Sequence, residues 1–290
     1  MGGTKVTIII GEIAYTNILP TFYYLDRKKL NELDCRFVPQ IPAELNRGMA
    51  NGAVDVGGIS SFAYGENFDR YTLLPNLSVS AYSQVGSLFL FSKKPIEELN
   101  EKSIALTSSS ATTVNLLKII LEKFYEFDVQ YEVMKPNFEE MLINHDACLL
   151  IGDDAIRTVW NKSNQIYMYD IGQLWYEHTG LPMTYAVFAV RNEVLESESE
   201  KLSMLYQQFI NSKTKSFEDR FQPMITSIKS DIGGTQAFWE QYFQGLSYDL
   251  DEQMLKGLNF YYQLAYELGY LKRKVQSISL WSAYDHCHSM

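Results

Sequence analysis

Short apolar segments alternate with amphipathic segments along the first two thirds of the chain, and this alternation limits the folds that it can adopt. Continuous apolar runs predict strands, at residues 6–10, 35–38, 54–59, 103–106, 130–134 and 147–151. Apolar residues at helical spacing predict helices between them, at residues 19–30, 42–49, 110–124 and 137–143. Strands that are apolar at nearly every position and separated by helices are typical of a parallel sheet covered on both faces. The sequence therefore predicts an α/β fold.

The strand and helix pattern occurs in two series, which predicts two lobes. Extended segments at residues 77–82 and 85–92 follow the first series, and the C-terminal third has helical spacing almost throughout. We expect lobe 1 to comprise residues 1–91 and 190–290, with the C-terminal helices, and lobe 2 to comprise residues 92–189. In this architecture small molecules bind in a cleft at the carboxyl ends of the strands.

The charge balance excludes partners that are themselves strongly acidic. The 290-residue chain has 25 Lys and Arg against 35 Asp and Glu, which gives a formal net charge of −10. This charge would repel a nucleic-acid backbone, so we expect no nucleic-acid partner. A small anionic ligand is still compatible with the composition, because a local pocket can oppose the net charge.

The apolar runs and the cysteines together predict the compartment. No apolar run reaches the length that a membrane-spanning helix needs, so we expect no membrane partner. The first apolar run is too short for a signal peptide, and Glu12 follows it at once. Cys35, Cys148 and Cys287 are far apart, and the first two lie in strand-like runs, where a free thiol behaves as a small hydrophobic group. We therefore expect a cytoplasmic protein with reduced thiols.

A segment rich in hydroxyl groups, residues 107–113, lies between a predicted strand and a predicted helix. Hydroxyl groups at a helix start cap the helix, and the free backbone N–H groups of its first turn point toward one spot. The positive end of the helix dipole adds to the attraction for a carboxylate or phosphate there. The segment predicts an anion site, although a helix cap without a ligand explains it equally well by itself.

Small polar residues follow several other predicted strands, and the fold brings such residues to one edge of a sheet. We expect the cleft to be lined by Tyr15, Asn17, Ser60, Ser61, Gly86, Ser87, Ser109, Ser110, Ala111, Thr112, Gly152, Asp153 and Pro182. Each residue alone is also explained by a turn or a cap, and Asn17 and Asp153 are typical helix-capping residues. Their number at strand ends favours a cleft of hydroxyl groups, amides and helix starts.

Other catalytic motifs do not occur in the sequence. It contains neither the glycine-rich nucleotide-binding patterns nor the G-x-S-x-G serine motif. His145 and His178 have no metal-ligand spacing, and His286, Cys287 and His288 lie at the chain end, where we expect a frayed tail. We therefore expect neither a metal nor a cofactor.

Short motifs occur in a fixed order along nearly the whole chain. They comprise Gly11, Ile13, Tyr15, Asn17 and Pro20; Pro42, Ala43, Glu44, Leu45, Asn46, Gly52 and Asp55; Ser60, Ser61 and Tyr64; Gly86, Ser87, Phe91 and Ser92; Leu106, Thr107, Ser108, Ser110, Ala111 and Thr112; Ile151, Gly152, Asp153 and Ala155; Tyr169, Asp170, Gly172 and Trp175; and Thr179, Gly180, Leu181, Pro182, Met183 and Arg191. In order and spacing they resemble the chorismate dehydratases of the futalosine route to menaquinone, a family with the type II periplasmic-binding-protein fold. Thr113 and Phe188 depart from the pattern, since serine and tryptophan are usual there.

The resemblance implies a lyase that removes water from chorismate to give 3-[(1-carboxyvinyl)oxy]benzoate, without a cofactor. It also implies a two-lobed periplasmic-binding-protein-like fold with an inter-lobe cleft and a helical C-terminal region. We expect Asn17 and Ser87 to hold the substrate and to hydrogen-bond the leaving hydroxyl group. The helix starts at Ser60 and Ser61 and at Ser109 and Ser110 would bind the two carboxylates of chorismate. The substrate's own enolpyruvyl carboxylate would remove the proton.

Two alternatives stay open at this point. A sister enzyme of the same pathway, 1,4-dihydroxy-6-naphthoate synthase, shares the fold but relies on a histidine whose pattern is not seen here. A non-catalytic solute-binding protein for a small carboxylate shares the fold as well, but it would need export.

Overall fold

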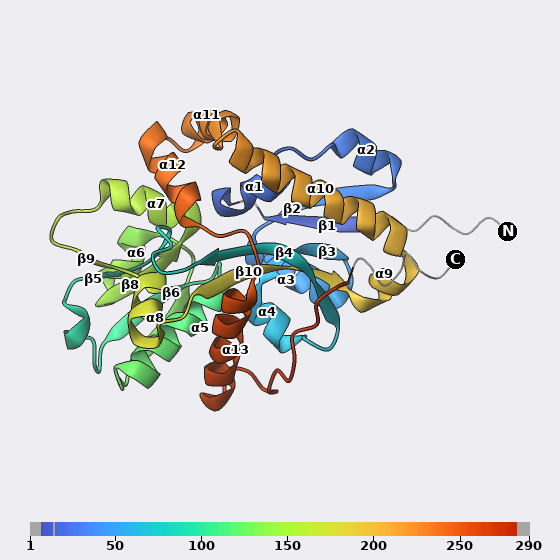
Figure 1. The fold of residues 1–290 in the computed structure, drawn as a ribbon. Helices are drawn as coiled ribbons and strands as arrows, with labels where there is room; N and C mark the ends of the chain where they lie inside the picture. Colours follow the sequence, from blue (N-terminus) through green and yellow to red (C-terminus); the bar gives the residue numbers. More distant parts are fainter. Residues whose placement is uncertain (1–6, 14, 283–290) are drawn as a thin grey trace.

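The computed structural model describes residues 7–13 and 15–282, and within this part of the chain two five-stranded sheets form the centres of two lobes (Figure 1). The first sheet has the strand order β2–β1–β3–β10–β4, and its strands are β1 Ile8–Ile13, β2 Cys35–Gln40, β3 Val56–Ser60, β4 Tyr71–Ala81 and β10 Met183–Arg191. The second has the order β7–β6–β8–β5–β9, and its strands are β5 Leu88–Ser92, β6 Ser103–Thr107, β7 Gln130–Met134, β8 Ala147–Ile151 and β9 Tyr167–Asp170. The predicted α/β class is confirmed.

Both sheets are mixed, whereas the apolar strand pattern predicted parallel sheets. β1 pairs in parallel with β2 and β3, and β6 pairs in parallel with β7 and β8. β10 is antiparallel to β3 and β4, and β5 is antiparallel to β8 and β9. The chain enters β5 and β10 from the other lobe. A strand runs parallel to its predecessor only when a crossover connection returns the chain to the same end of the sheet. In the described part of the chain no such connection precedes β5 or β10, so these two strands are antiparallel to their neighbours.

The chain passes between the lobes at residues 82–87 and 180–182, because β5 belongs to the second sheet and β10 to the first. The expected boundaries, after residue 91 and before residue 190, lie at the far ends of the same two strands. A buried strand has the same apolar pattern in either sheet, so the pattern does not show which sheet it joins. We propose that the lobe boundaries lie in the two short connections.

Helices follow most of the strands, as predicted. In the first two thirds of the chain they are α1 Leu19–Phe22, α2 Arg27–Glu32, α3 Pro42–Asn51, α4 Ser61–Glu66, α5 Ala111–Ile119, α6 Phe138–Ile143, α7 Gly152–Asn161 and α8 Ile171–Thr179. The predicted single helix at residues 19–30 is wrong, because it is divided into α1 and α2. The Tyr24 N–H donates to Ser212 Oγ at 2.9 Å instead of continuing the helix, and the Asp26 carboxylate caps α2 by accepting from the Lys29 N–H at 3.0 Å.

Helices cover both faces of the first sheet (Figure 1). α1 and the long helix α10, Ser199–Glu218, cover one face, and α3 and α4 cover the other. On the α10 side the rings of Phe22, Phe188 and Phe209 have centroids 5.3 to 5.9 Å apart. Phe188, one of the two departures from the family pattern, therefore fills the lobe core.

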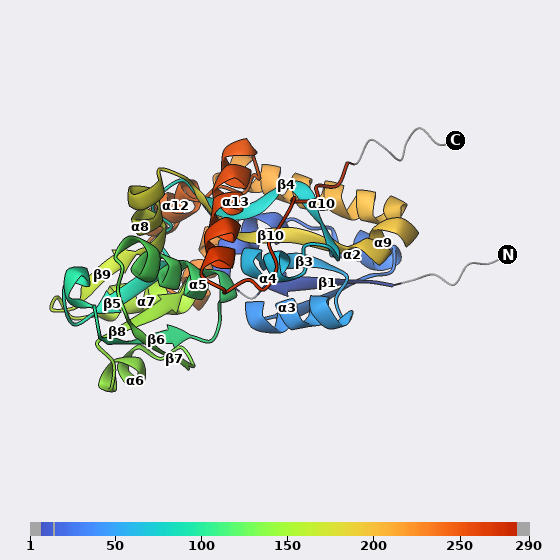
Figure 2. The same cartoon turned by 90° about the horizontal axis from the view of Figure 1, so that it is seen from below.

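The C-terminal helices include two that contact both lobes. The chain continues from β10 through α9 Asn192–Ser197 and α10 to α11 Gln222–Asp231, α12 Gln236–Gly245 and α13 Glu252–Glu267. The Trp239 ring of α12 lies 6.1 Å from Trp160 of α7, and the Tyr261 ring of α13 lies 6.4 Å from Trp175 of α8. Figure 1 and Figure 2 show α13 on one side of the molecule, beside the junction of the two lobes. These helices therefore hold the lobes together.

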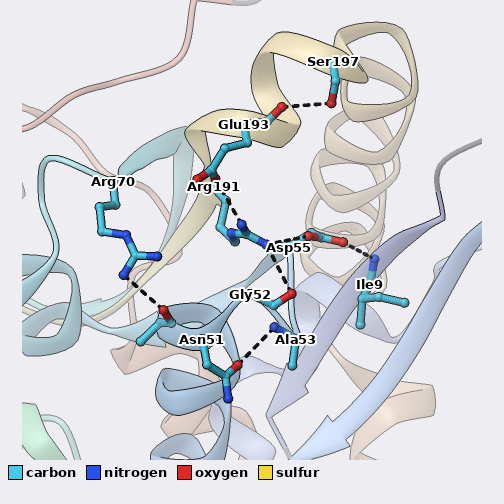
Figure 3. Close-up of polar contacts among 10 residues, drawn as sticks. Ile9, Asn51, Gly52, Ala53, Asp55, Arg70, Arg191, Glu193 and Ser197 are labelled. Atoms are coloured by element: carbon cyan, nitrogen blue, oxygen red, sulfur yellow. Dashed lines mark hydrogen bonds and ion pairs between the residues drawn. The ribbon is translucent and has the colours of Figure 1, made fainter.

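A half-buried ion pair joins three segments of the first lobe at the end of the sheet away from the second lobe (Figure 3). Arg191 Nη1 lies 3.3 Å from Asp55 Oδ1 and donates to the Gly52 carbonyl at 3.2 Å. The other carboxylate oxygen of Asp55 accepts a hydrogen bond from the Ile9 N–H at 2.9 Å. Arg191 also pairs with Glu193, which is largely exposed. The network fixes β1, the α3–β3 turn and β10 to one another.

Cys35 and Cys148 are buried free thiols, as the sequence predicted. Burial raises the pKa of Cys35 to about 11 and that of Cys148 to about 12, so both stay protonated and unreactive near neutral pH. Cys287 and its two neighbouring histidines lie outside the described residues. Among the helices of the described residues, none has the length and the apolar composition that a bilayer span needs.

Candidate functional site

A small cavity lies between the lobes, where the carboxyl ends of β1, β3 and β8 meet the start of α5. Its volume is about 50 Å³, and it is lined by Ile13, Tyr15, Asn17, Pro42, Ser60, Val79, Leu88, Ser110, Thr113, Ile151, Tyr185 and Ala186. Four of the predicted cleft residues, Tyr15, Asn17, Ser60 and Ser110, share this cavity. They come from both lobes, so the tertiary structure brings together polar residues that the sequence only placed at separate strand ends.

Asn17 lies in the 3-10 turn Thr16–Ile18 (η1) and is half-buried. The capping interpretation is wrong, because the N-cap of η1 is Tyr15 and that of α1 is Ile18. Among the described residues, none forms a hydrogen bond with the Asn17 carboxamide. A free amide that lines a cavity has two donors and an acceptor for a ligand.

The starts of α4 and α5 face each other at the cavity. Ser60 and Ser110 cap these helices, as predicted, since each hydroxyl oxygen accepts from the backbone N–H three residues on, at 3.2 and 3.1 Å. The two starts also touch directly. Thr112 Oγ1 accepts from the Phe62 N–H at 3.0 Å and lies 3.2 Å from Ser61 Oγ. One helix start from each lobe is therefore held against the other.

The cavity wall offers hydrogen-bond donors without formal charge. Among the described residues that line it, none is Asp, Glu, His, Lys or Arg. An anion there would be bound by backbone N–H groups, hydroxyl groups, the Asn17 amide and the positive ends of helix dipoles. No group of three His, Cys, Asp or Glu side chains in the described part of the chain could hold a metal ion.

The Tyr15 ring packs across the lobes against Gly152, the first residue of α7. Gly152 has a φ of 58°, and a Cβ there would lie 3.0 Å from Tyr15 Cδ1, so the position requires glycine. Burial raises the pKa of Tyr15; the Ser109 hydroxyl partly offsets this, and the negative charges of Asp154 and Asp153 add to it. Tyr15 is therefore a protonated donor at neutral pH.

A hydrogen bond from Thr16 to Asp153 joins the lobes beside the cavity. Asp153 Oδ1 accepts from Thr16 Oγ1 at 2.5 Å and from the Thr16 N–H at 3.4 Å. The capping interpretation of Asp153 is wrong, because Ile151 is the N-cap of α7. Burial raises the pKa of Asp153, and the two Thr16 donors oppose this rise. A groove of about 410 Å³ under α11 contains Asp153 and shares Ile13 and Tyr15 with the cavity.

Ser87, predicted to be catalytic, is fully buried in the connection between the lobes. Its hydroxyl oxygen accepts from the Tyr242 hydroxyl of α12 at 3.0 Å, and its carbonyl accepts from the Gly152 N–H at 2.7 Å. The preceding Gly86 N–H donates to the Asp170 carboxylate at 2.7 Å. Ser87 is not among the lining residues, although the next residue in the sequence, Leu88, is.

The remaining predicted residues do not line the cavity. These are Ser61, Ser109, Ala111, Thr112 and Pro182, and Gly86, Gly152 and Asp153 lie outside the lining set as well. Their assignment as substrate-binding residues stays a prediction.

Thr113, which belongs to the predicted anion-site segment 107–113, also lines the cavity. Sequence reasoning missed seven residues of the cavity wall, namely Ile13, Pro42, Val79, Leu88, Ile151, Tyr185 and Ala186. Tyr185 is the most informative of them, because its buried hydroxyl has no hydrogen-bond partner among the described residues. Burial and the nearby Asp170 carboxylate raise its pKa well above the usual value. In the sequence Tyr185 is one apolar strand residue among several, so no local signal marks it.

Comparison with known proteins then identifies the family. Residues 8–267 match the family model described as menaquinone biosynthesis. The chain belongs to the menaquinone biosynthesis family. Within that family's relatives, the chorismate dehydratase of Thermus thermophilus is 32% identical, over 64% of this chain and 70% of that protein. The chorismate dehydratase of Campylobacter jejuni is 26% identical, over 63% and 67%. The 1,4-dihydroxy-6-naphthoate synthase of T. thermophilus is 24% identical, over 52% and 54%.

Solved structures confirm the fold of this menaquinone biosynthesis family member. A protein of Archaeoglobus fulgidus superimposes with a TM-score of 0.73 at 20% identity, and the match covers 91% of this chain and 98% of that one. The alkanesulfonate-binding protein of Xanthomonas axonopodis superimposes with a TM-score of 0.70 at 15% identity, over 94% and 97%. At these identities the likeness shows the two-lobed periplasmic-binding-protein fold alone.

Proposed function

We propose that this chain is a cytoplasmic lyase that removes water from chorismate to give 3-[(1-carboxyvinyl)oxy]benzoate. Family membership and the two chorismate dehydratase relatives support the reaction. The observation that carries the proposal is that the free Asn17 amide shares one inter-lobe cavity with the caps of two facing helix starts. Chorismate has two carboxylates, and each helix start is suited to bind one.

The chemistry asks little of the protein beyond orientation. A ring C–H proton and the ring hydroxyl group leave together as water, and the ring becomes aromatic, which makes the elimination strongly downhill. Donors at the leaving hydroxyl group lower the barrier by stabilising the charge that develops on its oxygen. Asn17 supplies such a donor from the cavity wall, and Ser87 supplies a second from the adjacent connection.

Proton removal falls to the substrate in this proposal. Among the described residues of the cavity wall, none acts as a general base near neutral pH. Tyr15 and Tyr185 are kept protonated by burial. The enolpyruvyl carboxylate of chorismate is then the base nearest to the proton that leaves.

Substrate access requires the lobes to separate. The cavity of about 50 Å³ is well below the roughly 300 Å³ at which small-molecule pockets begin. The adjoining groove shares Ile13 and Tyr15 with it, and Thr16 and Asp153, which are hydrogen-bonded to each other, line that groove. We place the hinge in the two short connections, residues 82–87 and 180–182, because both cross between the sheets there.

The test is to incubate purified protein with chorismate and to follow the aromatic product by absorbance and chromatography. Asn17→Ala and Ser87→Ala should each lower kcat by about 100-fold or more, as loss of a transition-state donor does. Asn161→Ala, which removes a carboxamide at the exposed end of α7, is the matched control and should keep full turnover. Near wild-type turnover of both site variants contradicts the assignment. Consumption of cyclic dehypoxanthinyl futalosine instead of chorismate supports a naphthoate synthase, and tight binding of chorismate without product supports a solute-binding protein.

A further inference from the structure

Two consecutive tyrosines of α13 reach the two helix starts that face the cavity. Tyr261 Oη donates to the Thr112 carbonyl, in the first turn of α5, at 3.2 Å. Tyr262 Oη donates to the Ser61 carbonyl, in the first turn of α4, at 2.6 Å. Both tyrosines are buried. One helix outside the cavity thus contacts the helix start of each lobe.

Tyr261 donates its hydrogen bond to the peptide unit whose N–H is bound by the Ser110 cap of α5. The Thr112 carbonyl and the Thr113 N–H belong to the same peptide unit, and that N–H donates to Ser110 Oγ at 3.1 Å. Hydrogen bonding to a peptide carbonyl polarises the unit and strengthens donation by its N–H. Ser110 and Thr113 both line the cavity. The Tyr261 hydroxyl is therefore one peptide unit away from the cavity wall.

The Tyr262 hydrogen bond acts on the contact between the lobes in the same way. The Ser61 carbonyl shares a peptide unit with the Phe62 N–H, which donates to Thr112 Oγ1 of the other lobe at 3.0 Å. Ser61 Oγ in turn donates to the Thr184 carbonyl of β10 at 2.7 Å. A continuous chain of hydrogen bonds runs from α13 through α4 to α5.

The position of α13 itself is closely set. A Cβ on Gly257 would lie 2.0 Å from the carbonyl oxygen of Pro182, so this helix approaches the second connection between the lobes as only glycine permits. Consecutive helical residues point about 100° apart, because an α-helix has 3.6 residues per turn. Tyr261 and Tyr262 therefore point in different directions and form hydrogen bonds with different lobes.

We propose that Tyr261 and Tyr262 are positioning residues that set the separation of the two helix starts, and so the affinity for a substrate with two carboxylates. The inference rests on the proposed function. The ring carboxylate does not change in the elimination, so interactions with it are equal in the ground state and the transition state, whereas the enolpyruvyl carboxylate takes up the proton. Loss of such uniform binding raises KM and leaves kcat unchanged.

The experiment compares Tyr261→Phe and Tyr262→Phe with Tyr270→Phe. Tyr270 lies just beyond α13, and its hydroxyl donates to Glu122 outside the cavity, so its removal is a matched deletion of one hydroxyl group. We expect each site variant to raise KM for chorismate about 3- to 10-fold, the effect of one hydrogen bond. The variant at the helix start that binds the ring carboxylate should keep kcat within twofold. The Kd of the product, measured by calorimetry, should rise by the same factor. Tyr270→Phe should leave KM and Kd unchanged.

The outcomes separate the inference from the proposed function. If the wild-type protein converts chorismate and both site variants keep its KM and product Kd, the inference is overturned and the proposed function stands. A KM increase of equal size in Tyr270→Phe also overturns the inference, since the effect is then one of general stability. If the wild-type protein neither converts chorismate nor binds the product, the proposed function fails and the inference falls with it.

Discussion

The Arg191 network predicts that two carboxylates on the same arginine differ widely in their contribution to stability (Figure 3). Asp55 is 14% exposed and pairs with Arg191, which is 18% exposed, whereas Glu193 is 66% exposed. Asp55→Ala removes the charge partner of Arg191 and the acceptor of the Ile9 N–H. Glu193→Ala removes only a solvated partner. The two substitutions delete the same kind of group at opposite degrees of burial.

The size of the effect follows from the burial. Breaking a fully buried ion pair costs about 3–5 kcal/mol, because one charge is left without compensation. Here both side chains keep some contact with water, and Arg191 retains its hydrogen bond to the Gly52 carbonyl, so we expect about 2–4 kcal/mol for Asp55→Ala. An exposed pair contributes about 0–1 kcal/mol, so Glu193→Ala should stay within about 0.5 kcal/mol of the wild type.

Thermal unfolding followed by circular dichroism measures the difference. At about 2–4 °C per kcal/mol for a chain of this order of size, Asp55→Ala should lower Tm by roughly 4–16 °C. Glu193→Ala should change it by no more than about 2 °C. The network lies at the end of the first sheet away from the cavity, so folded Asp55→Ala protein should keep its kcat. If both variants lower Tm equally, or Asp55→Ala lowers it by no more than about 1 °C, the burial argument is refuted.

Two further predictions concern α7. Gly152→Ala should lower the free energy of unfolding by about 1–2 kcal/mol, since a left-handed backbone disfavours a Cβ. It should also weaken substrate binding, because the new methyl group displaces the Tyr15 ring. An unchanged Tm together with an unchanged KM contradicts this prediction. Asp153→Asn should alter the pH dependence of stability. Burial raises the folded-state pKa of Asp153, so the wild-type protein loses stability as the pH rises from about 4 through that pKa. The variant, which has no carboxyl group to titrate at this position, should lack this loss. Urea unfolding between pH 4 and pH 7 measures it, and a wild-type stability that rises with pH relative to Asp153→Asn is the contrary result.

Local sequence patterns determined the elements and their caps. Ser60 and Ser110 are caps because a hydroxyl group and the N–H three residues on are neighbours in any helix start, whatever surrounds them. Helix α3 begins at Pro42 and ends before Gly52 for reasons that are equally local. The resemblance of ordered motifs supplied the family and hence the fold. These are interactions over a few residues, which a sequence displays directly.

Only the tertiary structure decided what lies between the lobes. Thr16 meets Asp153 across 137 residues, and Tyr261 meets Thr112 across 149, so neither pairing leaves a local pattern in the sequence. The mixed sheets and the division of α1 from α2 have the same origin, because each depends on which distant backbone or hydroxyl group is within hydrogen-bonding distance. The sequence determined which residues could bind an anion, and packing over long separations determined which of them share a cavity.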